Sequence, residues 1–468
     1  MRILFITAGI CATRGLSNTY QESLMEGLVG RGHQVACLCT AEVSGQPGVS
    51  WACRQREPYP LYAVFNGGVY PALYPQGGIG SRDPLRDAQG SPALRRAILE
   101  IVRAEQPDVV SIQSLFGLPF DVVDAIQHEG IPVVFTAHDY FVLCPTAHLF
   151  LPAGQPCRLT DADLVCARCC RTAPSYRAFR QAWQLDRLAA RFDSRPIVRN
   201  AIWRVRNVLK RIDGGLPGPG KPAAYSARRR QAIRFLNRLA VLHCISRCQA
   251  GVFRQICGPL PNVRVLPLMP PSLETAVPVP RLRDRNPNIS FAALNINGAF
   301  KGSQLLAEAF QRLARTGAAC ELHVYGNWQP GPAIPRVSYH GRYQSADLDR
   351  IAARSDFCIV PSVGDETLGF TGLEMLARGV PLIASNRAGV GDFIADGRNG
   401  LLFDPASADS LCVAIEKAMQ PACTVRRGGE PASEFPLRSF TGHVQDMENL
   451  FREASRNRPE PQAATICR

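Results

Sequence analysis

A short stretch in the C-terminal half of the chain most strongly constrains its fold. Two apolar runs, Phe357 to Pro361 and Val380 to Ala384, flank a segment that carries several glycines. Apolar runs of this length are typical of buried strands, and the segment between them predicts a short helix that begins near Thr371 and ends at Gly379. A strand, a glycine-bearing loop, a helix and a second strand in this order predict a parallel sheet of the α/β class.

This predicted helix offers a binding site for an anion at its N-terminus. The first-turn amides of a helix lack partners within it, and open α/β sheets bind ligands beyond the carboxyl ends of their strands. Glu366 precedes the helix and Glu374 lies within it. These carboxylates can accept hydrogen bonds from hydroxyls on either side of a diphosphate, a ribose and a sugar. The alternative is a solvated loop acid and an exposed helix acid, and the surrounding strands and glycines favour the site.

The spacing of Glu366 and Glu374 resembles the E-x7-E signature of retaining glycosyltransferase family 4, and the resemblance covers residues 1–170 and 240–420. It implies the GT-B fold, in which two Rossmann-like domains face each other across a cleft. It also implies that Glu366 holds the donor sugar, that Glu374 holds the nucleotide ribose and that amides between them hold the diphosphate. The donor-binding residues expected from the family pattern are Gly15, Lys301, Glu366, Phe370, Thr371, Gly372, Leu373 and Glu374.

The start of the chain continues the resemblance. Ile3 to Thr7 is expected as a strand, residues 9–15 as a loop, and Asn18 with Gln21 as the cap of a helix. The family often has two adjacent glycines in this loop, of which the chain has only Gly15. The G-x-G-x-x-G fingerprint of dinucleotide-binding proteins is absent from the loop, which argues against a dinucleotide-dependent oxidoreductase.

Two further residues are expected to act in catalysis together with Glu366. His138 follows the predicted strand Val133 to Ala137, where the family commonly has a functional histidine that bonds a sugar hydroxyl or the leaving phosphate. The alternative is a histidine satisfied by local backbone groups. Lys301 opens a predicted helix and can meet a phosphate as a point charge. The family's arginine five positions earlier is replaced here by Ile296.

A cysteine-rich loop follows His138. The chain has 17 cysteines and no recognisable export signal, which favours reduced thiols over a disulfide framework. Four of the cysteines can place their sulfurs tetrahedrally around a structural zinc ion. The alternative is that they are reduced thiols packed as small apolar side chains. The candidate metal ligands are Cys144, Cys157, Cys166 and Cys169.

Two D-x-D patterns raise the question of a metal-dependent donor site. Asp161 and Asp163 lie inside the cysteine-rich loop, with no strand before them. Asp347 and Asp349 follow Ser345, which is expected to cap a helix whose dipole the two acids complement. Neither pattern predicts a metal site, so no cofactor is expected to be required for catalysis.

The positive charge of the chain is concentrated in one segment. The formal net charge is +14, and residues 171–240 carry 17 Lys and Arg against three Asp. Tryptophans at 183 and 203 alternate with arginines on predicted amphipathic helices, a pattern that suits an anionic membrane surface. The alternative is a solvated basic face whose aromatic side chains pack on the N-terminal domain. No nucleic-acid-binding module accompanies the segment, so nucleic acid is not expected as a partner.

These features predict an α/β protein with two domains. We expect an N-terminal Rossmann-like acceptor domain at 1–265 with a basic helical insertion at 171–240, and a nucleotide-sugar donor domain at 271–420. A helical segment at 421–456 and a disordered tail at 457–468 are expected to follow.

The resemblance implies transfer of a sugar from a nucleotide-sugar donor to a glycan or lipid-linked acceptor, with retention of anomeric configuration. The expected location is the cytoplasm, with the possibility of a peripheral site on the cytoplasmic face of the membrane. Two alternatives stay open. One is a GT-B protein that binds a nucleotide sugar or a partner enzyme without turnover, and the other is a nucleotide-sugar 2-epimerase.

Overall fold

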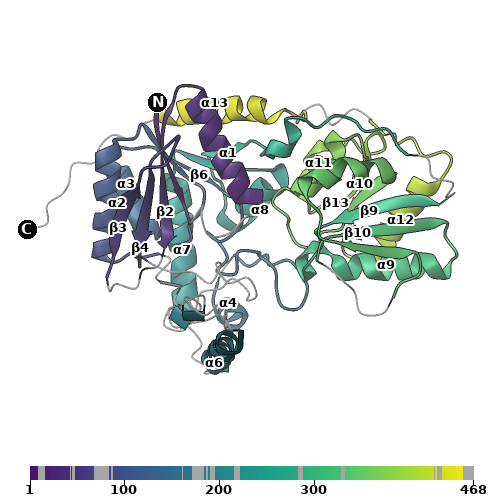
Figure 1. Ribbon diagram of the computed structural model, residues 1–468, viewed down its shortest axis with the longest axis horizontal. Coiled ribbons are helices and arrows are strands. Elements are labelled where there is room, and N and C mark those ends of the chain that lie inside the picture. The colour runs from purple at the N-terminus through teal and green to yellow at the C-terminus, as the bar shows by residue number, and fades with distance from the viewer. Residues whose placement is uncertain are drawn as a thin grey trace, which may run out of the picture.

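The computed structural model places two α/β units side by side along the long axis of the molecule (Figure 1). The residues that it describes are 1–8, 16–42, 44, 48–67, 84–85, 88–160, 162–170, 184–185, 188–189, 196–215, 222–282, 288–327, 333–425, 427–428 and 435–456.

The N-terminal unit is built on a sheet with the strand order β3-β4-β2-β1-β5-β6-β7-β8. All neighbouring strands are parallel except β3 and β4. The central strands are short apolar runs buried on both faces, as parallel strands covered by helices require. The strands are β1 (Arg2–Thr7), β2 (Gln34–Glu42), β3 (Ser50–Arg54), β4 (Leu61–Phe65), β5 (Val109–Ile112), β6 (Val133–Thr136), β7 (Val241–Cys244) and β8 (Val263–Val265).

The helices of this unit begin at polar caps where the sequence supplies them. Ser91 accepts a hydrogen bond from the Leu94 amide at the start of α2, and Ser246 caps α8. The expected cap at Asn18 is wrong: α1 begins at Leu16, and the Gln21 side chain accepts the Thr7 hydroxyl instead. The helices are α1 (Leu16–Gly30), α2 (Pro92–Glu105), α3 (Phe120–His128), α4 (Leu164–Cys169), α6 (Pro196–Gly215), α7 (Pro222–Arg238) and α8 (Arg247–Cys257).

The C-terminal unit has a fully parallel sheet with the order β11-β10-β9-β12-β13-β14. The direction in which successive strands are added reverses between β9 and β12, and such switch points are where open α/β sheets bind ligands. The strands are β9 (Ile289–Leu294), β10 (Cys320–Tyr325), β11 (Val337–Gly341), β12 (Phe357–Val360), β13 (Leu382–Ser385) and β14 (Gly400–Phe403).

The helices of this unit include the one predicted between Phe357 and Ala384. It is α11 (Phe370–Ala377), and Gly379 follows it with a φ of 76°. Ser345 does not cap the next predicted helix, because Gln344 and Asp347 form a capping box around a short 3-10 turn. The remaining helices are η2 (Pro271–Leu273), η3 (Ala299–Lys301), α9 (Ser303–Arg315), η4 (Ser345–Asp347), α10 (Leu348–Arg354), η5 (Gly389–Phe393) and α12 (Ala408–Met419).

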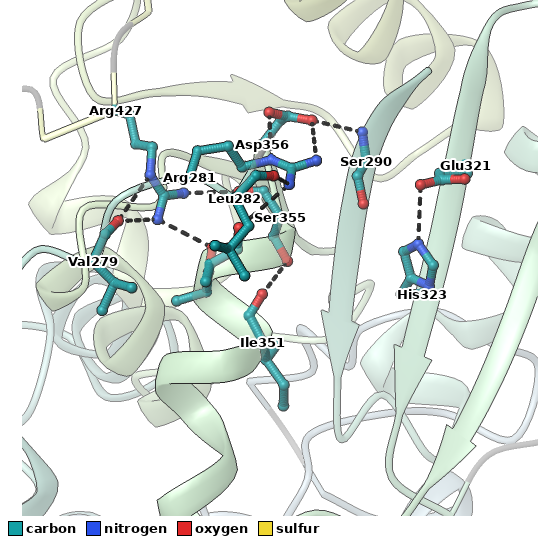
Figure 2. A network of polar contacts seen from close by, with 12 residues as sticks. Val279, Arg281, Leu282, Ser290, Glu321, His323, Ile351, Ser355, Asp356 and Arg427 are labelled. Carbon is teal, nitrogen blue, oxygen red and sulfur yellow. Dashed lines mark hydrogen bonds and ion pairs between the residues drawn. The ribbon is translucent and has the colours of Figure 1, made fainter. Parts of the chain in front are cut away.

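A polar network closes the amino ends of β9 and β12 (Figure 2). The Asp356 carboxylate accepts the Ser290 amide at 2.9 Å and the Arg281 Nε–H at 2.9 Å. Arg427 donates to the Ser355 and Val279 carbonyls at 2.8 and 2.5 Å. The network ties the chain before β9 and the chain after α12 to one end of the sheet. The carboxyl ends, the edge at which open α/β sheets bind ligands, face away from it.

The last described helix, α13 (Phe440–Arg456), returns to the N-terminal unit and lies beside α1 (Figure 1). The Tyr20 hydroxyl and His443 Nε2 share a hydrogen bond of 2.8 Å, and Glu448 pairs with Arg31 at 2.6 Å. The expected tail at 457–468 lies outside the described residues.

The segment 171–240 is not one exposed basic insertion. Arg228 and Arg229 of α7 are 1% and 2% exposed, and they donate hydrogen bonds to backbone carbonyls of the loop after β6. At 222–238 the predicted helix is present as α7, and it packs inside the N-terminal unit against α3 and α4, so Arg228 and Arg229 are not available to a membrane surface. By contrast, α6 lies away from both sheets (Figure 1), and Trp203 and Val205 on it are exposed. Trp183 lies outside the described residues.

None of the helices that the described ranges contain is both long enough and apolar enough to cross a membrane.

Candidate active site

The switch point of the C-terminal sheet brings together two residues that the sequence singled out. Lys301 follows β9 and Glu366 follows β12, and the Lys301 ammonium forms an ion pair with Glu366 Oε1. The Ser362 hydroxyl donates to the other carboxylate oxygen of Glu366. Glu366 is 9% exposed, so it is not the solvated loop acid that was the alternative.

Gly302 explains why Lys301 can reach this position. A Cβ atom on Gly302 would lie 1.7 Å from the Pro361 carbonyl oxygen, and the residue has a φ of 77°. Only glycine tolerates both the close approach and the left-handed backbone. The turn before α9 therefore packs directly on the end of β12 and sets Lys301 beside Glu366.

The start of α11 presents fewer amides than the sequence suggested. The helix begins at Phe370, one residue before the predicted start, and the amides of Gly372 and Leu373 donate to the Gly369 carbonyl at 3.0 and 3.4 Å. Within the described part of the chain, the Phe370 and Thr371 amides make no hydrogen bond. These two amides are the ones available to an anion at the helix N-terminus.

Glu374 also belongs to this arrangement, and a residue of η2 holds its side chain in place. Its side chain is 2% exposed and accepts a hydrogen bond of 2.6 Å from the Ser272 hydroxyl of η2. Burial raises the pKa of Glu374, while Ser272 and Arg378 oppose the shift. The alternative of an exposed helix acid is wrong, because α11 turns this carboxylate toward η2, in the segment that joins the two units.

His138 approaches the same loop from the N-terminal unit. Its carbonyl accepts the Thr367 hydroxyl at 3.1 Å, and its Nε2 lies 2.8 Å from Gln113 Oε1. Burial, and to a smaller extent His243, lowers the pKa of His138 to about 3, so the ring is neutral at ordinary pH. Because Gln113 Oε1 can only accept, Nε2 carries the proton and Nδ1 is left as an acceptor. Such a ring suits a sugar hydroxyl better than a phosphate.

Several contacts join the two units around this loop, and the sequence did not predict them. Arg158 of the N-terminal unit forms a bidentate ion pair with Asp365, one arm of which measures 2.5 Å. The Ser246 hydroxyl donates to the Thr367 carbonyl at 2.7 Å. The partners lie more than one hundred residues apart in the chain, so no local pattern reveals them.

Other residues of the site were also missed. Ser362, Ser272 and Gln113 each orient a predicted site residue by one hydrogen bond. Serines and glutamines occur throughout such a chain, and nothing in their spacing distinguishes these three. Gly15, which was expected to approach the donor, lies outside the described residues.

The four candidate metal ligands come together in the structure. They line a cavity of about 10 Å³ with Cys170 and the buried Arg229. The cysteines that the structure describes are all free thiols. Over the described ranges, no three such side chains have the arrangement of a metal site. Zinc binding by Cys144, Cys157, Cys166 and Cys169 therefore stays a prediction.

A cavity of about 1010 Å³ opens beside Asp365, between the two units. It is lined by the loop after β6, by α8 and α9, and by loops that follow β12, β13 and β14. Arg158, Arg387 and Glu308 contribute charge to its wall, and Gln155 and Gln304 contribute amides. Side chains of this kind pair with hydroxyl groups.

Family models match both halves of the chain. A model described as "Glycosyltransferase Family 4" matches residues 17–179. A second, described as "Glycosyl transferases group 1", matches residues 286–420.

Curated relatives match over shorter stretches. The chain is 35% identical over 112 residues to an exopolysaccharide phosphotransferase of Streptomyces coelicolor, which covers 23% of this chain and 12% of that protein. It is 26% identical over 170 residues to alpha-D-kanosaminyltransferase of Streptomyces kanamyceticus, covering 33% of this chain and 43% of the relative. The chain thus spans less than half the length of these relatives.

Solved structures match over almost the whole length of the chain. Sucrose-phosphate synthase from Thermosynechococcus elongatus has a TM-score of 0.56 at 15% identity, and the match covers 97% of this chain and 96% of the other. Fold and matches together define the class of protein: the chain has the GT-B fold, with two Rossmann-like units. Its two halves resemble the two kinds of glycosyltransferase domain that the family models describe.

Proposed function

We propose that this protein is a glycosyltransferase that moves a sugar from a nucleotide-sugar donor to a hydroxyl of a glycan or lipid-linked acceptor. The observation that carries the proposal is the cluster of Lys301, Glu366 and the start of α11 at the switch point, with the buried Glu374 behind it. The matches of both halves to glycosyltransferase family models support it.

The cluster suits the chemistry of a departing diphosphate. As the bond between the sugar and the diphosphate breaks, negative charge grows on the leaving phosphate oxygen. The Lys301 ammonium and the amides of Phe370 and Thr371 would stabilise that charge. Glu366, which pairs with Lys301, would accept hydroxyls of the donor sugar, and Glu374 would accept those of the ribose.

We propose that transfer retains the anomeric configuration. The carboxylates on the loop after β12 are both held by cations, Asp365 by Arg158 and Glu366 by Lys301, which disfavours either as a covalent nucleophile. A front-face step needs no nucleophile from the protein: the acceptor oxygen bonds to the sugar as the diphosphate leaves, and the acceptor proton passes to the departing phosphate oxygen. Full transfer by Glu366→Ala, or an inverted product by NMR, would contradict this mechanism.

A basic and apolar helix supports an acceptor at a membrane surface. Ile197, Trp203, Val205 and Val208 of α6 are exposed, and arginines lie between them in the sequence. Such a helix can lie in an anionic lipid interface, which we propose to be the cytoplasmic face of the membrane. We expect flotation with anionic vesicles at low salt that Trp203→Ala weakens. The matched control is Trp51→Ala, because Trp51 is similarly exposed, at 39%, but lies on strand β3 and not on α6.

We also propose that the cysteine cavity holds a structural zinc ion. A zinc ion bound by four thiolates carries a net negative charge, and the buried guanidinium of Arg229 lines the same cavity. Purified protein is expected to contain about one equivalent of zinc, released when Cys166 and Cys169 are replaced by serine. Metal analysis that finds less than about a tenth of an equivalent would contradict the proposal.

One observation favours a second candidate, a nucleotide-sugar-binding protein without turnover. Ile296, at the position of the family's arginine, is 3% exposed in the core of the C-terminal unit, so it offers no second cation. A nucleotide-sugar 2-epimerase has less support, because Asp365 and Glu366 are both ion-paired and offer no free proton-transfer acid.

The test is a thermal-shift and hydrolysis screen against UDP-, GDP-, ADP- and dTDP-sugars. We expect one nucleotide class to stabilise the protein and to lose its sugar slowly. Glu374→Ala should abolish the stabilisation, whereas Glu416→Ala, at an exposed position of α12, should not. Stabilisation without hydrolysis or transfer would favour the second candidate, and no stabilisation by any donor would contradict both.

A further inference from the structure

The loop between β6 and α4 has a defined shape. The Tyr140 amide donates to the Ala147 carbonyl at 3.1 Å, and the Cys157 amide donates to the Leu149 carbonyl at 2.6 Å. Phe150 and Pro156 form an antiparallel bridge within it. These bonds fold the loop back on itself and fix the position of residues 147–149, the tip of the loop.

The backbone at this tip is strained around one residue. Ala147 and Leu149 have φ values of 63° and 47°, in the left-handed region that residues with a Cβ atom rarely adopt. Both are buried, at 2% and 0% exposure, whereas His148 between them is exposed. Strain of this kind persists only where the surrounding structure enforces it, and it concentrates at functional sites.

The strained loop places His148 in contact with the C-terminal unit. Its imidazole stacks on the ring of Phe300, with the ring centroids 4.7 Å apart and the planes 17° from parallel. Phe300 immediately precedes Lys301, whose ammonium lies 5.5 Å from the same ring. The Phe300 carbonyl accepts the Val363 and Gly364 amides, at 2.9 Å each, from the loop that carries Glu366.

The charge state of His148 fits a hydrogen-bonding role. Although His148 is partly exposed, neighbouring protein atoms partly desolvate its imidazole, and this desolvation lowers its pKa. The positive charge of Lys301 adds to the shift. A neutral imidazole keeps one N–H donor and one acceptor. It can therefore bond an anionic oxygen beside Lys301 without adding a second positive charge, at a place where the core position of Ile296 leaves the site short of donors.

We propose that His148 is a donor-contacting residue, whose imidazole donates a hydrogen bond to the diphosphate of the nucleotide sugar bound by Lys301 and Glu366. This inference rests on the proposed function, since it requires a nucleotide-sugar donor in that site. It assigns a substrate contact to the N-terminal unit in addition to His138.

The test compares His148→Ala and His148→Gln with the wild type by calorimetric titration of UDP, GDP, ADP and the corresponding nucleosides. His128→Ala is the matched control, because His128 is exposed on α3. We expect His148→Ala to weaken the tightest nucleoside diphosphate about tenfold, because a hydrogen bond to a charged group is lost. Nucleoside affinity should not change, any fall in melting temperature from the lost stacking on Phe300 should be shared by both variants, and His148→Gln, which keeps an N–H donor, should restore most of the binding.

Three outcomes would overturn the inference. Unchanged diphosphate affinity in His148→Ala would remove His148 and leave the proposed function standing. An equal loss for nucleoside and diphosphate, or an equal loss of diphosphate affinity in His148→Ala and His148→Gln, would show a general distortion instead of a phosphate contact. A wild-type protein that binds no nucleoside diphosphate would remove both the inference and the proposed function.

Discussion

The two units contribute to the candidate site in different ways. In the C-terminal unit, Lys301 and Glu366 lie on loops that directly follow β9 and β12. In the N-terminal unit, His148 and Arg158 lie on a long loop after β6 that crosses to the other unit and is held by buried arginines of α7. We call the residues that each unit contributes a half-site. The C-terminal half-site, Lys301 and Glu366, lies at strand ends and can be recognised from a short motif. The N-terminal half-site, His148 and Arg158, lies on a crossing loop and depends on contacts between residues far apart in the sequence.

The largest expected effect is on the C-terminal half-site. Lys301→Ala should lower turnover of the nucleotide sugar by about 10²–10³-fold, the loss typical when a group that stabilises transition-state charge is removed. Steady-state kinetics with the donor identified in the screen would measure it, with Lys417→Ala at an exposed position of α12 as the control. A loss of no more than about twofold would remove Lys301 from the chemistry.

The second prediction tests whether this half-site depends on local packing. Gly302→Ala should lower the free energy of unfolding by about 4 kcal/mol, because its Cβ would meet the Pro361 carbonyl oxygen at 1.7 Å. Gly317→Ala is the matched control, since Gly317 has a φ of 72° but nothing within 4 Å of a Cβ, and it should lose only about 1–2 kcal/mol. Equal losses in urea denaturation would mean that the contact with β12 is not needed.

The third prediction tests the crossing loop. Arg158→Ala removes the closer of two arginine partners of Asp365, whose side chain is 2% exposed, and leaves only Arg387 at 3.9 Å; it should lower the free energy of unfolding by about 1–3 kcal/mol. Arg158 itself is partly exposed, so solvent moderates the loss. Arg312→Ala, which breaks surface pairs with Glu308 and Asp409, should cost less than about 1 kcal/mol. Matching losses would indicate that the loop is not anchored by this pair.

The smallest expected effect concerns the return of α13 to the N-terminal unit. Hydrogen bonds from Arg31 and Arg452 lower the pKa of Glu448 from 4.5 to about 2. A carboxyl group with a lowered folded-state pKa stabilises the protein above its unfolded pKa, and the stabilisation is lost as the pH falls from about 4.5 toward about 2.

Glu448→Gln should therefore lower the free energy of unfolding by about 1–2 kcal/mol at neutral pH, the range for hydrogen bonds to charged groups. The difference from the wild type should shrink below pH 4.5, the ordinary pKa of the group. Denaturation curves across the pH range would measure it, and a difference independent of pH would rule out the ionised carboxylate as its cause.

Sequence reasoning located the elements of the C-terminal half-site more accurately than their hydrogen bonds. Strand β12, helix α11 and strand β13 lie where the apolar runs and Gly379 predicted them, because these signals act within a few residues. Of the four expected donor-binding residues Phe370 to Leu373, the amides of Phe370 and Thr371 are available, because the helix begins one residue early and the amides of Gly372 and Leu373 donate to the Gly369 carbonyl. A shift of one residue at a helix end is beyond such signals.

The sequence alone determined the α/β class, the parallel sheet of the C-terminal unit and the positions of Lys301 and Glu366 on loops that follow strands, because strand periodicity and the residues after each strand are local properties. Only the tertiary structure decided that Arg228 and Arg229 are buried, that Glu374 turns to Ser272 and that His148 lies on Phe300. These contacts join segments far apart in the chain, and their energies depend on burial and distance, which exist only once the chain has folded.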